Sequence, residues 1–360
     1  MKKIKLLLVL TLLLLVTESS FSQTASGGEV VGRNIFGLAT DYQGDPVLIE
    51  DRPLIYNNSA FEEIITIKKS NFLVSGFNNL IGGIYLTKLG EDRSQKIDTI
   101  PLKLVKMDGL TSPAGGKITD WNTVLFSETG LINGADSTQF VTDFKSYFKG
   151  KANLVNPYKY GWVSEVIVLN DQGQAKTIKN YSLGRLFANQ VVVMPDNKTI
   201  YTIDKLGNLY MFVAKQARSL AKGKLYAVVR NNDQVDYALL GAQAALKVKF
   251  KLKRAKFKSI FKSKVPKKQR CSKMYTYVET IYGQECLMVK KKYKKYAGLF
   301  EPIRVMAMKG YSAFVAANSQ MDFNQENMKI TLSHVDQNEL ILVLGEDLKL
   351  NSKYIIKESL

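Results

Sequence analysis

Short apolar runs separated by turn sequences recur along this chain and constrain its fold more than any other feature. Strand-like runs of about five to eight residues, bounded by Gly, Pro, Asn and Asp, are typical of an all-β sandwich, barrel or propeller. Their periodicity does not choose among these three architectures, and no internal repeat is visible. The runs lie within residues 71–89, 162–169, 190–201 and 205–213.

Outside the lysine-rich region described below, two stretches are predicted to be helical, residues 137–149 and 214–222. Their apolar side chains recur at helical spacing, which favours contacts with the core over a functional role. Both are expected to be surface elements between strands.

Three separated segments carry more specific information. Residues 114–128 read AGGKITDWNTVLFSE, residues 160–190 contain YGWVSEV and LGRLFANQ, and residues 199–229 contain TIYTIDKLGNLYMFV and GKLYAVV. Their order and spacing resemble the PhoX-type alkaline phosphatases, secreted β-propeller enzymes that hydrolyse phosphomonoesters with an iron and calcium cluster. The resemblance implies one all-β propeller domain with few surface helices over residues 23–360. Looser matches are residues 71–89 and the MDFNQE of 321–326.

The metal-binding positions of that family are substituted in this chain. The resemblance puts the family's cysteine at Ser127 and its second acidic residue at Thr129. In the second motif, Ala188 stands at the histidine and Asn189 at the ligand glutamate. The resemblance therefore implies a retained frame with altered chemistry.

The C-terminal match is altered in the same way. There the family's phosphate-side arginine becomes Phe323, and its ligand glutamate falls on Gln325, or on Glu326 if the register slips by one. No catalytic residue can be assigned. The only histidine, His334, lies in a strand-like run and is expected to be a strand residue rather than a base.

The substitutions decide which metal the site suits. Ferric iron needs anionic ligands such as thiolate and carboxylate, so we do not expect iron here. Calcium also accepts neutral oxygen ligands, so a calcium site is compatible with the chain. Its candidate ligands are Glu128, Asp322, Glu326 and Asp204.

Three functions follow as hypotheses. The first is a phosphatase-family protein that is impaired in catalysis and acts as a binding module, with a phosphorylated ligand as one candidate partner. The second is an active phosphomonoesterase with a rebuilt, calcium-type site. The third is a protein that binds anionic surfaces through a lysine-rich insert.

The first 22 residues are typical of a cleavable export signal. Three lysines within the first five residues precede an apolar run from Leu6 to Val16, and a polar stretch that ends in small residues at Ser20 and Ser22 follows. A run of eleven residues is too short to span a bilayer. The sequence predicts a secreted or periplasmic protein without a transmembrane span after cleavage.

Most of the net charge of +19 comes from one insert, placed at about residues 246–296. Residues 247–295 hold eighteen Lys or Arg and two acids. Residues 246–254, LKVKFKLKR, alternate and predict a half-buried strand with a cationic outer face. In the following stretch, Phe257, Ile260 and Phe261 predict a short amphipathic helix that ends before Pro266.

Two interpretations of this insert stay open. It could bind lipid headgroups, lipopolysaccharide, acidic polysaccharide or nucleic acid, the last without sequence specificity because lysine outnumbers arginine. It could instead be a solvated loop that protects an edge strand. The candidate anion-binding residues are Lys247, Lys249, Lys251, Lys253, Arg254, Lys256 and Lys258.

The two cysteines, Cys271 and Cys286, lie within the insert. In an exported chain they are expected to form a disulfide, which would stabilise the fold by roughly 3 kcal/mol through chain entropy. The alternative is a pair of free thiols.

Overall fold

The computed structural model describes residues 37–231, 234–334, 337–345, 347–349 and 355–357. The chain divides into two units, 1–32 and 33–360, and all described residues belong to the second. The predicted signal peptide, residues 1–22, lies outside the described residues. No helix in the described part of the chain is both long enough and apolar enough to cross a bilayer.

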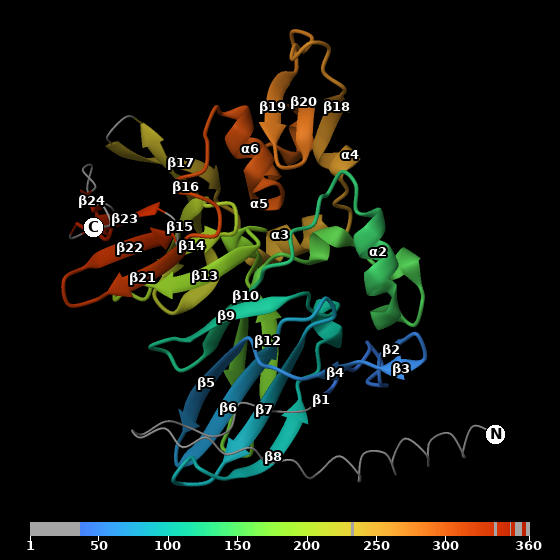
Figure 1. The fold of residues 1–360 in the computed structure, drawn as a ribbon, viewed down its shortest axis with the longest axis vertical. Helices are drawn as coiled ribbons and strands as arrows, with labels where there is room; N and C mark the ends of the chain where they lie inside the picture. The colour runs from blue at the N-terminus through green and yellow to red at the C-terminus, as the bar shows by residue number, and fades with distance from the viewer. Residues whose placement is uncertain (1–36, 232–233, 335–336, 346, 350–354, 358–360) are drawn as a thin grey trace. The chain divides into compact units, whose positions relative to one another are not determined.

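Four antiparallel sheets of four or five strands make up most of the unit, and the strands of each sheet follow the order of the chain (Figure 1). The first sheet holds β5 (Phe61–Ile67), β6 (Ser70–Phe77), β7 (Gly83–Leu89) and β8 (Lys96–Pro101), and the second β9 (Pro113–Ile118), β10 (Val124–Glu128), β11 (Val163–Val168) and β12 (Ala175–Lys179). The third holds β13 (Ala188–Val193), β14 (Thr199–Asp204), β15 (Leu209–Gln216), β16 (Ser219–Asn231) and β17 (Gln234–Gly241), and the fourth β21 (Gln320–Asn324), β22 (Lys329–His334), β23 (Gln337–Val343) and β24 (Ile355–Lys357).

The first strands of successive sheets lie side by side. Strand β5 contacts β9, β9 contacts β13, and β13 contacts β21. Four-stranded meanders that follow one another around a common centre are the blades of a β-propeller. The fold is therefore all-β and of the propeller type, as the resemblance implied, although no strand pairing within the described residues joins one blade to the next.

Successive blades bury apolar faces against each other. Because side chains alternate along a strand, Val124 and Phe126 of β10 pack with the first sheet, whereas Leu125 packs with the third. Residues of the third and fourth sheets, among them Tyr201 and Leu332, form a further cluster. This two-sided burial explains why β10 is buried along its whole length.

The smaller elements lie before the blades, between them and in the connections within them. Strand β1 (Gly37–Leu38) pairs with β4 (Ile55–Tyr56), and β2 (Leu48–Ile49) pairs with β3 (Arg52–Pro53). The 3-10 helices are η1 (Val105–Met107), η2 (Lys145–Phe148), η3 (Ala152–Leu154), η4 (Pro157–Lys159), η5 (Tyr181–Leu183) and η6 (Lys291–Tyr293).

One of the two predicted helices is confirmed and the other is wrong. Residues 137–149 form α2 (Thr138–Phe144) and η2. Residues 214–222 instead form the end of β15, a two-residue turn with Arg218 at a φ of 61°, and the start of β16. Ala214 and Leu220 are buried in the core here, so packing on the sheet overrides the helical preference of the intervening residues.

The lysine-rich insert begins with a helix rather than with a strand, and it is not a solvated loop. Residues 246–254 were predicted to be a strand, but Ala245–Leu252 form helix α3. Val248 and Leu252, four residues apart, lie on its buried face, whereas Phe250 is 61% exposed. The loop interpretation is also wrong, because the insert contributes to the largest core cluster.

The rest of the insert forms a small sheet on short helices. The predicted amphipathic helix is confirmed only as α4 (Phe257–Ile260), after which β18 (Phe261–Lys264) begins. Strand β18 pairs with β20 (Gly283–Val289), which also pairs with β19 (Thr276–Thr280). The predicted Cys271–Cys286 disulfide is confirmed. Helices α5 (Ala297–Phe300) and α6 (Pro302–Met308) follow before the fourth blade.

The helical register of α3 makes a quantitative prediction. Leu252→Ala should destabilise the protein by about 2–5 kcal/mol because Leu252 is buried. Phe250→Ala, the matched control, should change the free energy of unfolding by no more than about 0.5 kcal/mol. Denaturant unfolding measures both. Equal losses would mean that Phe250 is as buried as Leu252, as in the predicted strand.

Candidate functional site

A cavity of about 480 Å³ lies where the first strands of all four blades meet. Glu63 of β5, the Gly115–Ile118 part of β9, the Gln190–Val193 part of β13 and Met321–Phe323 of β21 line it. Because each blade contributes its first strand, the cavity is the central opening of the propeller-like arrangement. It is the natural candidate for a ligand site.

The charged groups around this cavity are mainly acidic. Glu63, Asp120 and Asp322 contribute three carboxylates, and Lys117 contributes one ammonium group. Burial raises the pKa of the Glu63 carboxyl, while the nearby Lys117 and the Ile118 N–H oppose that rise. Apolar side chains such as Ile118 and Phe323 form much of the remaining wall.

At the cavity, the backbones of β9 and β13 approach each other closely, and this contact fixes the two strands. Gly115 has a φ of 63°, and a Cβ at this position would lie 2.4 Å from the carbonyl oxygen of Asn189. Only glycine fits both the conformation and the space. The side-chain oxygen of Gln190 accepts a hydrogen bond from the Met321 N–H, which links β13 to β21.

The positions that the resemblance assigned to metal and phosphate ligands do not form a ligand set. Ser127 is buried in β10, and its hydroxyl has no hydrogen-bond partner among the described residues. Asn189 is half-buried at a bulge of β13, and Phe323 lies in the cavity wall. Gln325 and Glu326 are exposed in the turn between β21 and β22.

Of the candidate calcium ligands, only Asp322 lines the cavity. Glu128 is completely buried elsewhere, with Oε1 3.0 Å from Lys179 Nζ and 3.0 Å from the Thr111 N–H nitrogen. Its Oε2 accepts hydrogen bonds from the backbone N–H groups of Gly161 and Trp162. Both carboxylate oxygens of Glu128 are therefore engaged by groups of the protein itself, and neither is directed at a bound cation.

Burial acts on both members of this pair. It raises the pKa of the Glu128 carboxyl and lowers the pKa of the Lys179 ammonium group. The opposite charge of the partner favours the charged form of each group, and the backbone N–H donors of Thr111 and Trp162 further favour the Glu128 carboxylate. The attraction between the two charges and the hydrogen bonds to them therefore offset the free-energy cost of removing the pair from water.

Asp204 is also used internally. Its carboxylate accepts hydrogen bonds from the backbone N–H groups of Leu206 and Asn208, from the Asn208 side chain and from the Tyr210 hydroxyl. This pattern closes the β14–β15 turn. Burial raises the pKa of Asp204 to about 6, against the effect of these donors.

The residues present do not fit the iron cluster that the resemblance implies. A buried serine, a neutral amide and a phenylalanine stand where anionic or cationic groups would be required. Within the described ranges, no three His, Cys, Asp or Glu side chains come close enough to hold a metal ion. His334 is the last residue of β22, a strand position as predicted.

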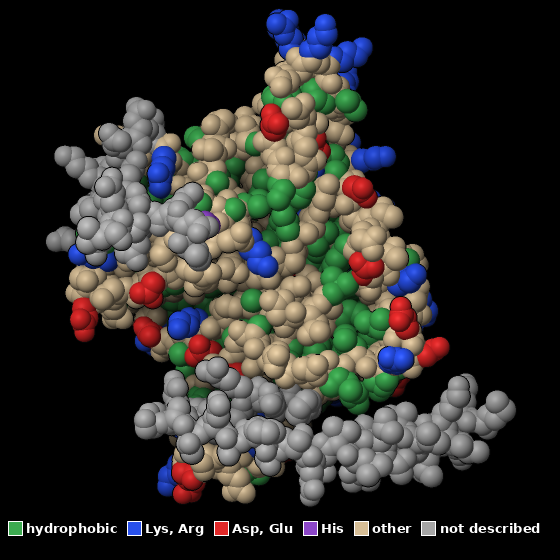
Figure 2. Space-filling view, in the orientation of Figure 1, with side chains coloured by type: hydrophobic (Ala, Val, Ile, Leu, Met, Phe, Trp, Pro, Cys, Tyr) green, Lys and Arg blue, Asp and Glu red, His purple; other side chains and the backbone are tan. Residues whose placement is uncertain are grey.

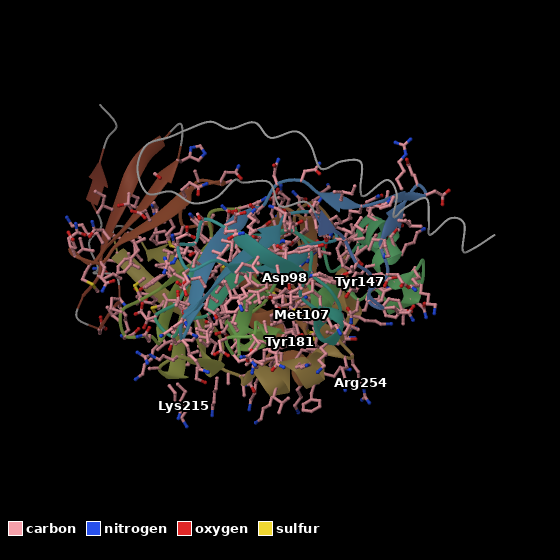
Figure 3. All side chains as sticks on the ribbon, turned by 90° about the horizontal axis from the view of Figure 1, so that it is seen from below. Asp98, Met107, Tyr147, Tyr181, Lys215 and Arg254 are labelled. Atoms are coloured by element: carbon pink, nitrogen blue, oxygen red, sulfur yellow. A yellow bond between two sulfur atoms is a disulfide. The ribbon has the colours of Figure 1, made fainter. Side chains whose placement is uncertain are left out.

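The predicted anion-binding residues lie together on α3, α4 and the connection between them. All are exposed except Lys251, which is half-buried with Nζ 4.7 Å from the centre of the Tyr293 ring. In Figure 3, Arg254 and Lys215 lie at the periphery of the unit, whereas Met107 and Tyr181 lie among packed side chains. No carboxylate among the described residues forms an ion pair with any of the seven.

Several residues of these sites were not anticipated from the sequence. Glu63, Lys117 and Asp120 line the cavity, and Lys179 pairs with Glu128. Lys179 is 51 residues from Glu128 in the chain and no motif contains it. The strand pairing of β11 with both β10 and β12 brings the two together, and that register was not predictable from a single sequence.

No protein-family model matches this sequence, and no curated protein matches it. Among solved structures, PhoX of Pseudomonas fluorescens in complex with vanadate is similar at 11% identity over 89% of this chain and 86% of that chain, with a TM-score of 0.34. A putative 6-phosphogluconolactonase from Bacteroides fragilis is similar at 9% identity over 90% and 95% of the two chains, with a TM-score of 0.26. The periplasmic gluconolactonase of Pseudomonas aeruginosa is similar at 9% identity over 91% and 96%, with a TM-score of 0.25. Because all three TM-scores are below 0.5, the fold assignment rests on the strand order and packing described above.

The environment of Asp204 predicts a pH dependence of stability. Its pKa is raised from 3.8 to about 6, so the folded state binds a proton that the unfolded state releases. The free energy of unfolding should fall by on the order of 3 kcal/mol as the pH rises through this interval. Denaturant unfolding between pH 4 and pH 7 should show this fall in the native chain and not in Asp204→Asn. Parallel pH profiles of the two proteins would contradict it.

Proposed function

We propose that this chain is a PhoX-like protein that binds a ligand without iron-dependent catalysis and works outside the cytoplasm. The observation that carries the proposal is the set of side chains at the positions that the resemblance assigns to charged ligands, where Ser127 of β10, Asn189 of β13 and Phe323 of β21 stand instead. The contacts of Glu128 support it as well. Lys179 supplies, from within the chain, the positive charge that a bound cation would otherwise supply.

This proposal predicts the metal content and activity of the purified protein. Elemental analysis should find far less than one iron per chain, and turnover of a chromogenic phosphomonoester should lie well below about 1 s⁻¹. Stoichiometric iron together with turnover would overturn the proposal. Hydrolysis that depends on added calcium would instead support the calcium-type phosphomonoesterase.

A second candidate function is the binding of anionic surfaces by the lysine-rich insert. The observation that favours it is structural: the insert is folded, packed on the main core and cross-linked, and it presents cationic side chains outward. Figure 2 shows Lys and Arg side chains gathered at the end of the unit formed by β18, β19 and β20. A folded, one-sided array of cations attracts polyanions and anionic headgroups.

This second candidate predicts salt-dependent binding to heparin. Neutralising Lys247, Lys249, Lys253, Lys256 and Lys258 to Gln should weaken retention and make its salt dependence shallower, because a protein with fewer cations releases fewer counterions from the polyanion when it binds. All five side chains are exposed, so the fold should be preserved. The control neutralises Lys215, Lys222 and Lys224, which are exposed on β15 and β16. Equal retention of both variants would rule out a specific role for the cations of α3, α4 and the connection between them.

A further inference from the structure

The connection between β18 and β19 combines charge and apolar exposure in a way that the rest of the insert does not. We call residues 264–274 the tip loop. It carries five cations and no acid, and all five are exposed. None of them forms an ion pair among the described residues, although Lys264 Nζ lies 4.8 Å from the centre of the Tyr275 ring. The five are Lys264, Lys267, Lys268, Arg270 and Lys273.

Two large apolar side chains lie among these cations. Val265 is 89% exposed and Met274 is 72% exposed, and no other large hydrophobic residue of the described chain is as exposed as either. In water this arrangement is unfavourable, because apolar area stays hydrated. Single exposed hydrophobic residues are common on protein surfaces, so it is the position of these two among five cations of one loop that points to an interaction surface.

The tip loop is also held in a defined conformation. Lys267 and Arg270 form an isolated antiparallel bridge, and the two residues between them, Lys268 and Gln269, have φ values of 47° and 57°. Such two-residue turns with two positive φ values usually contain Asn-Gly. The disulfide joins Cys271, the next residue, to β20 and fixes the base of this turn. A preformed loop loses little conformational entropy when it binds.

We propose that the tip loop docks on an anionic lipid bilayer, with its cations at the headgroups and Val265 and Met274 in the interfacial region. This inference rests on the anionic-surface function proposed above and names its partner. Basic side chains contribute electrostatic attraction to anionic lipid, and apolar side chains contribute through burial below the headgroups.

A soluble polyanion fits the tip loop less well. A sulfated polysaccharide would engage the cations but would leave Val265 and Met274 in water. Single-stranded nucleic acid gains much of its affinity from aromatic stacking. The tip loop contains no aromatic residue, and the neighbouring Tyr275 is half-buried. Of these three anionic partners, the bilayer is the one that uses both kinds of side chain.

Vesicle co-sedimentation of the full chain tests this inference. The vesicles are phosphatidylcholine alone, or phosphatidylcholine with about one third phosphatidylglycerol, at low and at physiological salt. The key variant, Val265→Ser with Met274→Ser, keeps every charge. The matched control, Leu246→Ser with Phe250→Ser, removes two exposed apolar side chains of α3 instead. Heparin retention is measured for each protein.

The expected result is binding of the native chain to the anionic vesicles only. The key variant should bind them at least about tenfold more weakly, because apolar burial contributes to interfacial binding. Its heparin retention should be unchanged, and the control should behave as the native chain. In addition, brominated lipid should quench the fluorescence of the tryptophan introduced by Val265→Trp, and it should not quench the fluorescence of the tryptophan introduced by Leu246→Trp.

The other outcomes separate this inference from the function on which it rests. If the native chain binds neither anionic vesicles nor heparin at low salt, both proposals are wrong. If it binds heparin but not vesicles, the partner is a soluble polyanion and the bilayer is excluded. If the key variant binds vesicles as tightly as the native chain, the binding is purely electrostatic, and the role of Val265 and Met274 is refuted while the anionic-surface function stands.

Discussion

The buried ion pair between Glu128 and Lys179 is the interaction on which the second blade depends. Through it, one carboxylate joins the end of β10 to the end of β12 and to the backbone that leads into β11. The N–H of Trp162 is one of its donors, and the Trp162 ring packs against Tyr181 and Phe300 in the main core. Removal of one partner would leave an unpaired buried charge, at a cost of about 3–5 kcal/mol. A position that resembles a metal-binding motif thus stabilises the fold.

A second buried network attaches the lysine-rich insert to the blades. Arg304 of α6 bonds Glu301 at 2.8 Å and Glu285 of β20 at 2.6 Å, and it also donates to Asn133. Glu301 in turn accepts from the Tyr158 hydroxyl at 2.6 Å. The two acids nearest to Arg304 are therefore used internally, and Glu285 is one of only two acids in the insert. This arrangement leaves the outer surface of the insert almost purely cationic on a rigid base.

The strands were predictable where turn residues and apolar alternation agree, as in β6 and β7 or in β11 and β12. Helix α3 was not, because Val248, Phe250 and Leu252 satisfy a period of two, while Val248 and Leu252 also satisfy helical spacing. Only the tertiary contacts decide between these two patterns.

The candidate site could be predicted only in part, because its lining also depends on tertiary contacts. Motif positions such as Phe323 were found at the cavity. Glu63 lies outside every motif and Lys117 was not assigned a role within its motif, and both reach the cavity only through the packing of the blades.

The contact between Gln190 and Met321 has a consequence for the order in which the protein folds. These residues are 131 positions apart, so β21 can meet β13 only after a long loop closes. The hairpins within each blade join residues much closer in sequence, and short loops close with less loss of entropy. We therefore expect the first three blades to assemble early and the fourth to dock last, with the insert and its disulfide already shortening the intervening chain. During synthesis, the exposed face of the third blade would be the surface most in need of protection from aggregation.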